Sequence, residues 1–315
     1  MSLGCMVWVY KGFDWQRELP RILAIDVRWV TVAVIADILV YCCQGWRWSL
    51  LLSPLARVPA WRSIQAVYIG LFANEILPLR TGEVIRSYLQ SKWAGLPFSV
   101  VISSAVIERL FDGIWLILGF YTITYFVTLP ALLVEGGRLL AVVLFTLTLL
   151  LGVAVFTKHR AHAAFAQSRW KEKLWHVIEG LHNMGNSQSF YASFALSFVY
   201  LALQVVPVYA LIKGYGLDLS IGAAVVVLVI LRIGSIPPQA PGNVGSFQAL
   251  TKLGLMLLGV QSDVATGFAT VLFFAVTVPL WLGGFVALAL TGMKLSDLHR
   301  DAHTRPGTVQ VEPQP

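Results

Sequence analysis

The chain has 315 residues, of which 57% are hydrophobic and only 12% are charged. Soluble globular domains carry about 25% charged residues, so this composition excludes an ordinary soluble enzyme, a disordered chain and a coiled coil. The net charge of +7 would suit nucleic acid, but most basic residues border apolar stretches, where membrane topology and anionic lipid head groups explain them better. We therefore expect a polytopic membrane protein whose partners are membrane lipids and not nucleic acid.

The N-terminal residues 1–10 are apolar, but a helix needs about 20 residues to cross a bilayer. A start site placed too far downstream, which removes most of a first helix, would explain such a short segment. The chain has three cysteines, at positions 5, 42 and 43, which are too few for a disulfide framework and lack metal-ligand spacing. We expect no metal and no cofactor.

Apolar stretches then follow along the chain, at residues 29–46, 63–79, 99–129, 139–157, 191–212, 221–235, 246–260 and 266–292. They are continuously apolar rather than alternating, which predicts helices, because a helix satisfies its own backbone in lipid. The predicted fold is all-α: one transmembrane helix bundle over residues 1–300, with about seven to eight membrane segments of roughly 20 residues. The stretches 63–79 and 221–235 are short and end near Pro and Gly, so they either cross the membrane or re-enter it.

Basic residues predict the orientation if every stretch crosses. The loops 1–28, 80–98, 158–190 and 293–315 then share one side and hold 15 Lys and Arg residues against five on the other. The positive-inside rule places this first set in the cytoplasm, although one re-entrant stretch would invert everything after it. Segment 158–190 alternates basic and apolar residues and predicts an amphipathic cytoplasmic helix, which either binds anionic lipid or only anchors the topology. The polar tail 301–315 is expected to be disordered.

An internal similarity links residues 76–84 with residues 236–244, since both fit the pattern I-x-P-x3-G-[EN]-V and each follows a short apolar stretch. Duplicated halves with broken helices are a recurrent plan of transporters, in which the breaks point to the binding site. The pattern predicts two repeats, 25–130 and 139–292, in parallel orientation. The predicted helix breaks or hinges are Pro78, Gly82, Pro238, Pro241, Gly242, Asn243 and Gly245.

Charged residues at membrane depth are the strongest candidates for a site, because burying a charge in a bilayer is costly. They concentrate around the first break, and the candidate substrate-binding residues are Asn74, Arg80, Glu83, Arg86, Glu108, Arg109 and Asp112. Either these groups neutralise one another in a buried network that joins helices, or they form a polar chamber in which arginines hold a phosphate by bidentate contacts. Glu108 and Asp112 share a helix face, and Arg109 reaches Asp112 three residues on.

Three further polar residues lie apart from this cluster. Asp37, within 29–46, either relays a proton or pairs with an arginine of a neighbouring helix. Arg232 and Lys252 flank the second break, where they either bind phosphate or extend to the membrane interface. No nucleophile–base pair is evident, so we expect no catalytic residue.

The run from Asn74 to Arg86 and the later Glu108-Arg-Leu-Phe-Asp112 resemble the lysylphosphatidylglycerol synthase transmembrane-region family, integral membrane proteins of bacteria and archaea with a flippase-like domain. The turn Pro241-Gly242-Asn243-Val-Gly245, with Pro238 and Phe247, is similar to the family's second characteristic turn. The resemblance covers about residues 25–290, but this chain has Gln248 where the family often has Glu. Family members usually begin with one more helix, and fused members add an aminoacyl transferase domain that this chain does not resemble.

The resemblance implies a plasma-membrane, multi-pass protein that handles polar lipids. The leading hypothesis is a flippase or lipid-binding transporter for a phosphate-bearing lipid of the bacterial or archaeal envelope, rather than an enzyme. One alternative is a membrane-embedded transferase that uses Glu83, Glu108 and Asp112 as acids or bases. Another alternative is a non-catalytic partner of an envelope-lipid synthase.

Overall fold

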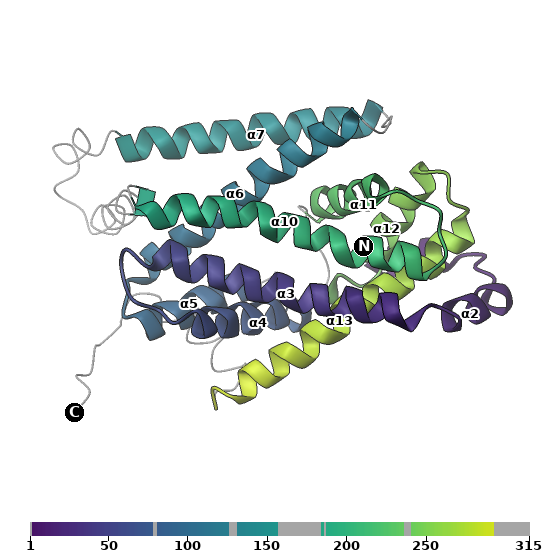
Figure 1. Cartoon of the computed structure of the whole chain (residues 1–315), viewed down its shortest axis with the longest axis horizontal. Coiled ribbons are helices and arrows are strands. Elements are labelled where there is room, and N and C mark those ends of the chain that lie inside the picture. The colour runs from purple at the N-terminus through teal and green to yellow at the C-terminus, as the bar shows by residue number, and fades with distance from the viewer. Residues whose placement is uncertain are drawn as a thin grey trace.

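The computed structural model describes residues 2–77, 81–125, 131–156, 184–185, 187–235 and 241–292. These residues form helices and no strand, which confirms the predicted helical membrane bundle (Figure 1). Three predicted break or site residues, Pro78, Arg80 and Pro238, lie outside the described residues. So do most of the segment 158–190 and all of the tail 301–315, whose predicted amphipathic and disordered character stays a prediction.

In chain order, the elements are α1 (Ser2–Tyr10), α2 (Trp15–Leu23), α3 (Val27–Leu52), α4 (Ala60–Ile76), α5 (Gly82–Ala94), α6 (Phe98–Thr124), α7 (Ala131–Phe156), α10 (Gln188–Gly214), α11 (Ile221–Gly234), the 3₁₀ turn η2 (Pro241–Asn243), α12 (Ser246–Leu257) and α13 (Ser262–Ala289). Among the described residues, α3, α10 and α13 are long and apolar enough to cross a membrane. The long helix α6 carries three charged residues in its middle, and these belong to the ion-pair network described below.

The helices α3 and α10 pack against each other along their length and run in opposite directions (Figure 1). At one end, the backbone N–H of Asp26 donates to the carbonyl of Gly214 over 3.2 Å. Further along, Arg47 Nη1 donates to Ser197 Oγ over 2.9 Å. The residue numbers therefore rise along α3 as they fall along α10, which defines an antiparallel pair.

The first pair of short helices, α4 and α5, forms a hairpin. Near its open end, Gln90 Nε2 donates to Ser63 Oγ over 2.8 Å. At its tip, the backbone N–H of Gly82 donates to Asn74 Oδ1 over 2.8 Å. The absence of a side chain at Gly82 lets the two helices approach, because a Cβ atom there would collide with the backbone oxygen of Gly70. The start of α4 and the end of α5 therefore lie at the same end of the bundle.

The second pair, α11 and α12, forms a similar hairpin. Gly234 lies against the side chain of Leu250, and Gly254 lies against Ile230. The tip between them contains η2, where Gly242 and Asn243 adopt positive φ angles of 71° and 50°. This left-handed backbone turns the chain sharply between the helices.

The two groups α3–α6 and α10–α13 therefore share one order of elements: a long helix, two short hairpin helices and a long helix. Their packing corresponds as well, since α3 contacts α4, α6 and α13, while α10 contacts α11, α13 and α6. The groups run antiparallel, so the predicted parallel orientation of the repeats is wrong. That prediction assumed that the apolar stretches 63–79 and 221–235 each cross the bundle. In the structure, each of them forms a hairpin with the next helix and returns to the end where it began.

The helix α5 occupies residues 82–94, which the sequence predicted to be loop. It is polar and largely buried within the protein, and the buried Arg86, Ser87, Gln90 and Ser91 lie on it. A polar helix is tolerated at membrane depth when its polar groups meet partners in the protein. The two larger buried apolar clusters are centred on α3–α5 and on α10–α13, and a small third one joins α3 to α10.

Candidate functional site

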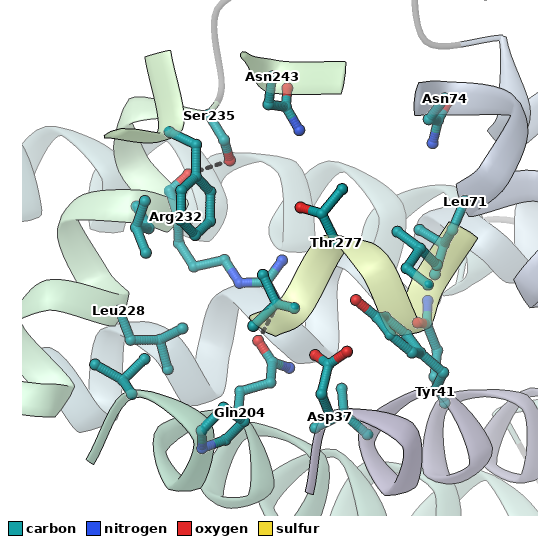
Figure 2. A pocket seen from close by; sticks show the side chains of 18 of the residues that line it. Asp37, Tyr41, Leu71, Asn74, Gln204, Leu228, Arg232, Ser235, Asn243 and Thr277 are labelled. Atoms are coloured by element: carbon teal, nitrogen blue, oxygen red, sulfur yellow. Dashed lines mark hydrogen bonds between the residues drawn. The ribbon is translucent and has the colours of Figure 1, made fainter. Parts of the chain in front are cut away.

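A cavity of about 610 Å³ lies between the two groups of helices. Its wall takes residues from the long helices α3, α6, α10 and α13 and from both hairpins. Figure 2 shows side chains from these elements pointing toward a common space, with Asp37 and Tyr41 on one side and Asn74 and Asn243 at the opposite rim. The cavity is therefore built from both halves of the chain.

The tips of the two hairpins lie next to each other at this cavity. Asn74 and Glu75 come from the end of α4, and Gly242 and Asn243 come from η2. A Cβ atom on Gly242 would lie 3.6 Å from the carbonyl oxygen of Glu75. Glu75, which directly precedes the first stretch with the I-x-P-x3-G pattern, thus lies beside Gly242 of the second stretch.

A network of ion pairs forms one side of the site. Arg47 Nη2 lies 3.1 Å from Glu108 Oε1, and the same guanidinium also pairs with Asp112. Arg86 Nη1 lies 3.1 Å from the other oxygen of Glu108. The side chains of Arg47, Arg86 and Glu108 are at most 1% exposed, so these charges are removed from solvent and compensate one another.

The network continues toward the cavity through Glu83. This carboxylate accepts from Arg86 Nε over 2.7 Å and also pairs with Arg109. Arg109 lies 3.6 Å from Asp112 as well. The side chains of Arg109, Glu83 and Asp112 are 43%, 35% and 19% exposed and line the cavity. Three arginines and three carboxylates therefore form one cluster. One end of it is buried, which we call the closed end, and the other end faces the cavity.

A further arginine lines the cavity from another helix. Arg232, on α11, is half-buried and donates to the side-chain oxygen of Gln204 on α10. Lys252 does not reach the cavity, because it is buried and donates to the backbone carbonyl of Val9 over 2.8 Å. Of the two basic residues that flank the second break, only Arg232 is placed to contact a ligand in this cavity.

Apolar side chains make up much of the remaining wall. They come from α4, α6 and α10–α13 and comprise Leu71, Leu116, Leu201, Leu228, Leu231, Phe247, Leu250, Leu272, Phe273, Val276 and Leu280. An aqueous ion needs no such lining, whereas a molecule with a charged and a hydrocarbon part does. Within the described part of the chain, no group of three His, Cys, Asp or Glu residues is arranged to hold a metal.

The predicted site and break residues take different places in the structure. Asn74, Glu83, Arg109, Asp112, Gly242 and Asn243 line the cavity. Arg86 and Glu108 lie behind it in the closed end of the network, and Gly82 closes the first hairpin. Pro241 lies in η2, and Gly245 donates its N–H to Gln248 Oε1 over 2.7 Å at the start of α12. Gln248, where the resembling family often has Glu, thus caps a helix here.

Arg47 is the main residue that the sequence analysis missed. It follows the stretch 29–46 and was counted with a loop, but α3 continues to Leu52. The signal was the apolar run from Trp48 to Leu52, which extends the helix beyond the arginine. Gln204 was also missed, because one amide in an apolar helix has no pattern of its own.

Comparisons with known proteins find membrane proteins. The family model described as lysylphosphatidylglycerol synthase TM region matches residues 1–284. A UPF0104 membrane protein of Methanothermobacter thermautotrophicus is 23% identical over 293 residues, which cover 86% of this chain and 84% of that protein. A UPF0104 membrane protein of Methanocaldococcus jannaschii is 30% identical over 146 residues, which cover 45% and 43%. No solved structure matches the chain.

Proposed function

The chain belongs to the lysylphosphatidylglycerol synthase transmembrane-region family, and on that premise we propose that it is a flippase or lipid-binding transporter. Its substrate would be a polar, phosphate-bearing lipid of the bacterial or archaeal plasma membrane. The observation that carries this proposal is the cavity between the hairpin tips, where cations and apolar walls face the same space.

Two arginines give the cavity its affinity for an anion. Arg109 and Arg232 face it from α6 and α11, and a guanidinium can hold a phosphate through two parallel hydrogen bonds. Sites for small ligands usually enclose about 300–1,000 Å³, and this cavity of about 610 Å³ is large enough for a head group and the first methylenes of its chains. The apolar residues would contact those methylenes.

Transport fits the carboxylates better than transferase chemistry does. Glu83, Glu108 and Asp112 each pair with at least one arginine. A general base must be free to take a proton from its substrate, and these three groups are already engaged. They are placed to position arginines.

We further propose that the protein is a multi-pass protein of the plasma membrane. The end of the bundle where α3, α7 and α13 finish is joined to the segments 53–59, 95–97, 157–187 and 290–315. These segments hold nine Lys and Arg residues, against three in the segments 1–26, 125–130, 215–220 and 258–261. The positive-inside rule would place the first set in the cytoplasm. Residues 1–28 then face outward, unlike the sequence-based expectation, because α4–α5 returns to its starting end.

Lipid movement by the purified protein in liposomes tests this function. Labelled phosphatidylglycerol and a labelled polyprenyl-phosphate lipid would be compared in the wild type, Arg109→Ala and Arg232→Ala. A hydrogen bond to a charged group contributes about 1.5–3 kcal/mol, so each variant should lower the transport rate at limiting lipid by about 10- to 100-fold.

The matched control is Arg138→Ala, an arginine on α7 whose side chain is 72% exposed and which should transport like the wild type. Wild-type protein that moves neither lipid, or cavity variants that match this control, would contradict the proposal.

A further inference from the structure

Asp37 lines the cavity but does not take part in the described ion-pair network. It lies inside α3, a helix that is long and apolar enough to cross a membrane. The residue is 6% exposed, and Figure 2 shows its carboxyl group pointing into the cavity near Gln204. Its Oδ2 atom is buried and has no hydrogen-bond partner within the described residues.

The surroundings of Asp37 differ from those of the other acidic residues of the cluster. Glu83, Glu108 and Asp112 each pair with arginine, whereas Asp37 forms no ion pair with any described residue. Tyr41, one turn further along α3, lines the cavity beside it. An ionised carboxylate without a cation is costly at membrane depth, and such residues commonly bind protons or ions.

Other polar groups face the same part of the cavity from every neighbouring element. They are Glu75 on α4, Tyr200 and Gln204 on α10, Arg232 on α11 and Thr277 on α13. The cation of this set, Arg232, donates to the side-chain oxygen of Gln204. Gln204 Nε2 is itself buried without a partner in the described part of the chain. The polar lining around Asp37 therefore offers hydrogen bonds but no dedicated counter-ion.

We propose that Asp37 is a reversible proton-binding site that couples lipid movement to proton movement, an inference that rests on the proposed transport function. The proton comes from water in the cavity and returns to water when the carboxyl group ionises again. Protonation removes one negative charge from the cavity that Arg232 also lines. A phosphate near Arg232 then meets less repulsion, so protonation and phosphate binding favour each other, and the linkage is reciprocal.

The identity of the ion follows from the donor set. Sodium and other hard cations need several oxygen ligands around one point. Asp37 lacks the arginine partner that Glu83, Glu108 and Asp112 have. Glu75 also faces this part of the cavity, but beside Asp37 the amide of Gln204 presents an N–H donor. An N–H donor repels a cation but can donate to a carboxyl oxygen. A proton therefore suits the site better than a metal ion.

Infrared titration of the purified protein tests the proton site without any transport. A protonated carboxyl group has a C=O stretch that disappears on ionisation. We expect the wild type to show such a band that is lost as the pH rises, and Asp37→Asn to lack it. The control Glu135→Gln, which changes an exposed carboxylate on α7, should keep the band. A wild-type spectrum with no component that Asp37→Asn removes would overturn the proton site.

Transport into liposomes with an imposed pH gradient tests the coupling. The wild-type rate should follow the direction of the gradient, and Asp37→Asn should lose this dependence. A wild-type rate that ignores the gradient, or follows sodium instead, would overturn the coupling. If the infrared band titrates but no lipid moves in the wild type, the proposed transport function fails while the proton site stands.

Discussion

Arg47 on α3 and Glu108 on α6 form an ion pair of 3.1 Å whose two side chains are 0% and 1% exposed. Glu108 uses its other oxygen to accept from Arg86 on α5. One carboxylate thus joins three helices, including the first hairpin, behind the cavity. A buried pair of this kind gives little net stability, but the loss of one partner leaves an uncompensated charge.

Replacing Arg47 by alanine should therefore destabilise the protein strongly. Glu108 and Asp112 would each lose a partner, and breaking a buried pair costs about 3–5 kcal/mol. Thermal unfolding in detergent should show a large fall in Tm relative to the wild type. Arg138→Ala removes an exposed pair with Glu135 and should leave Tm almost unchanged. Equal Tm values for the two variants would contradict the structural role of Arg47.

Gly82→Ala should prevent the first hairpin from closing. A Cβ atom at this position would lie 2.7 Å from Asn74 Oδ1 and would also collide with the backbone of Gly70. The yield of monodisperse protein in size-exclusion chromatography should fall sharply. Gly136→Ala is the matched control, because its Cβ atom meets nothing within 4 Å and alanine favours a helix by about 1 kcal/mol. A normal yield of Gly82→Ala would show that the helices do not pack this closely.

Asn74 should hold the tip of the hairpin through its hydrogen bond from the Gly82 N–H. Asn74→Ala leaves this donor without its partner, at a cost of about 1–3 kcal/mol. Hydrogen exchange should become faster in the first turn of α5. Asn74→Asp keeps an acceptor oxygen, and its charge is favourable at a helix N-terminus, so exchange should return toward the wild-type rate. Equal exchange in Asn74→Ala and the wild type would exclude this role.

The hairpin topology predicts which positions share a side of the membrane. In a background without Cys5, Cys42 and Cys43, the exposed positions Arg57 and Lys92 would be changed to cysteine, as would the exposed positions Asp218 and Gln261. A membrane-impermeant maleimide should label the first two from one side and the last two from the other. Labelling of Arg57→Cys and Lys92→Cys from opposite sides would show that α4 crosses alone.

The helical bundle and its long helices could be predicted from the sequence because continuous apolar stretches have few other solutions in a membrane. The relative orientation of the helix groups α3–α6 and α10–α13 could not be predicted from the sequence. Helix α4 has 17 residues, which is the lower limit for crossing a membrane, and α11 has 14, which is below it. The apolar stretches in the sequence did not show that each helix forms one arm of a hairpin. The contacts at Gly82 and Gly234 decide this, and they depend on partners that are distant in sequence.

The candidate site was predictable in part for a similar reason. Asn74, Glu83, Arg109 and Asp112 stand out as polar groups in apolar surroundings, and all four line the cavity, although their role in binding substrate stays a prediction. Arg86 and Glu108 show the same pattern in sequence, but they pair with each other behind the cavity. Exposure to the cavity depends on helix packing, which local sequence does not report.

Photo-crosslinking from inside the cavity tests most directly whether a lipid head group occupies it. A photoreactive amino acid would replace Thr277, which points into the cavity (Figure 2), or Leu282, an exposed residue of the same helix. With a phospholipid radiolabelled in its phosphate, both positions should capture lipid. The double change Arg109→Ala and Arg232→Ala should abolish capture only at position 277. No capture at position 277, or capture that ignores both arginines, would contradict the proposal that this cavity binds the head group.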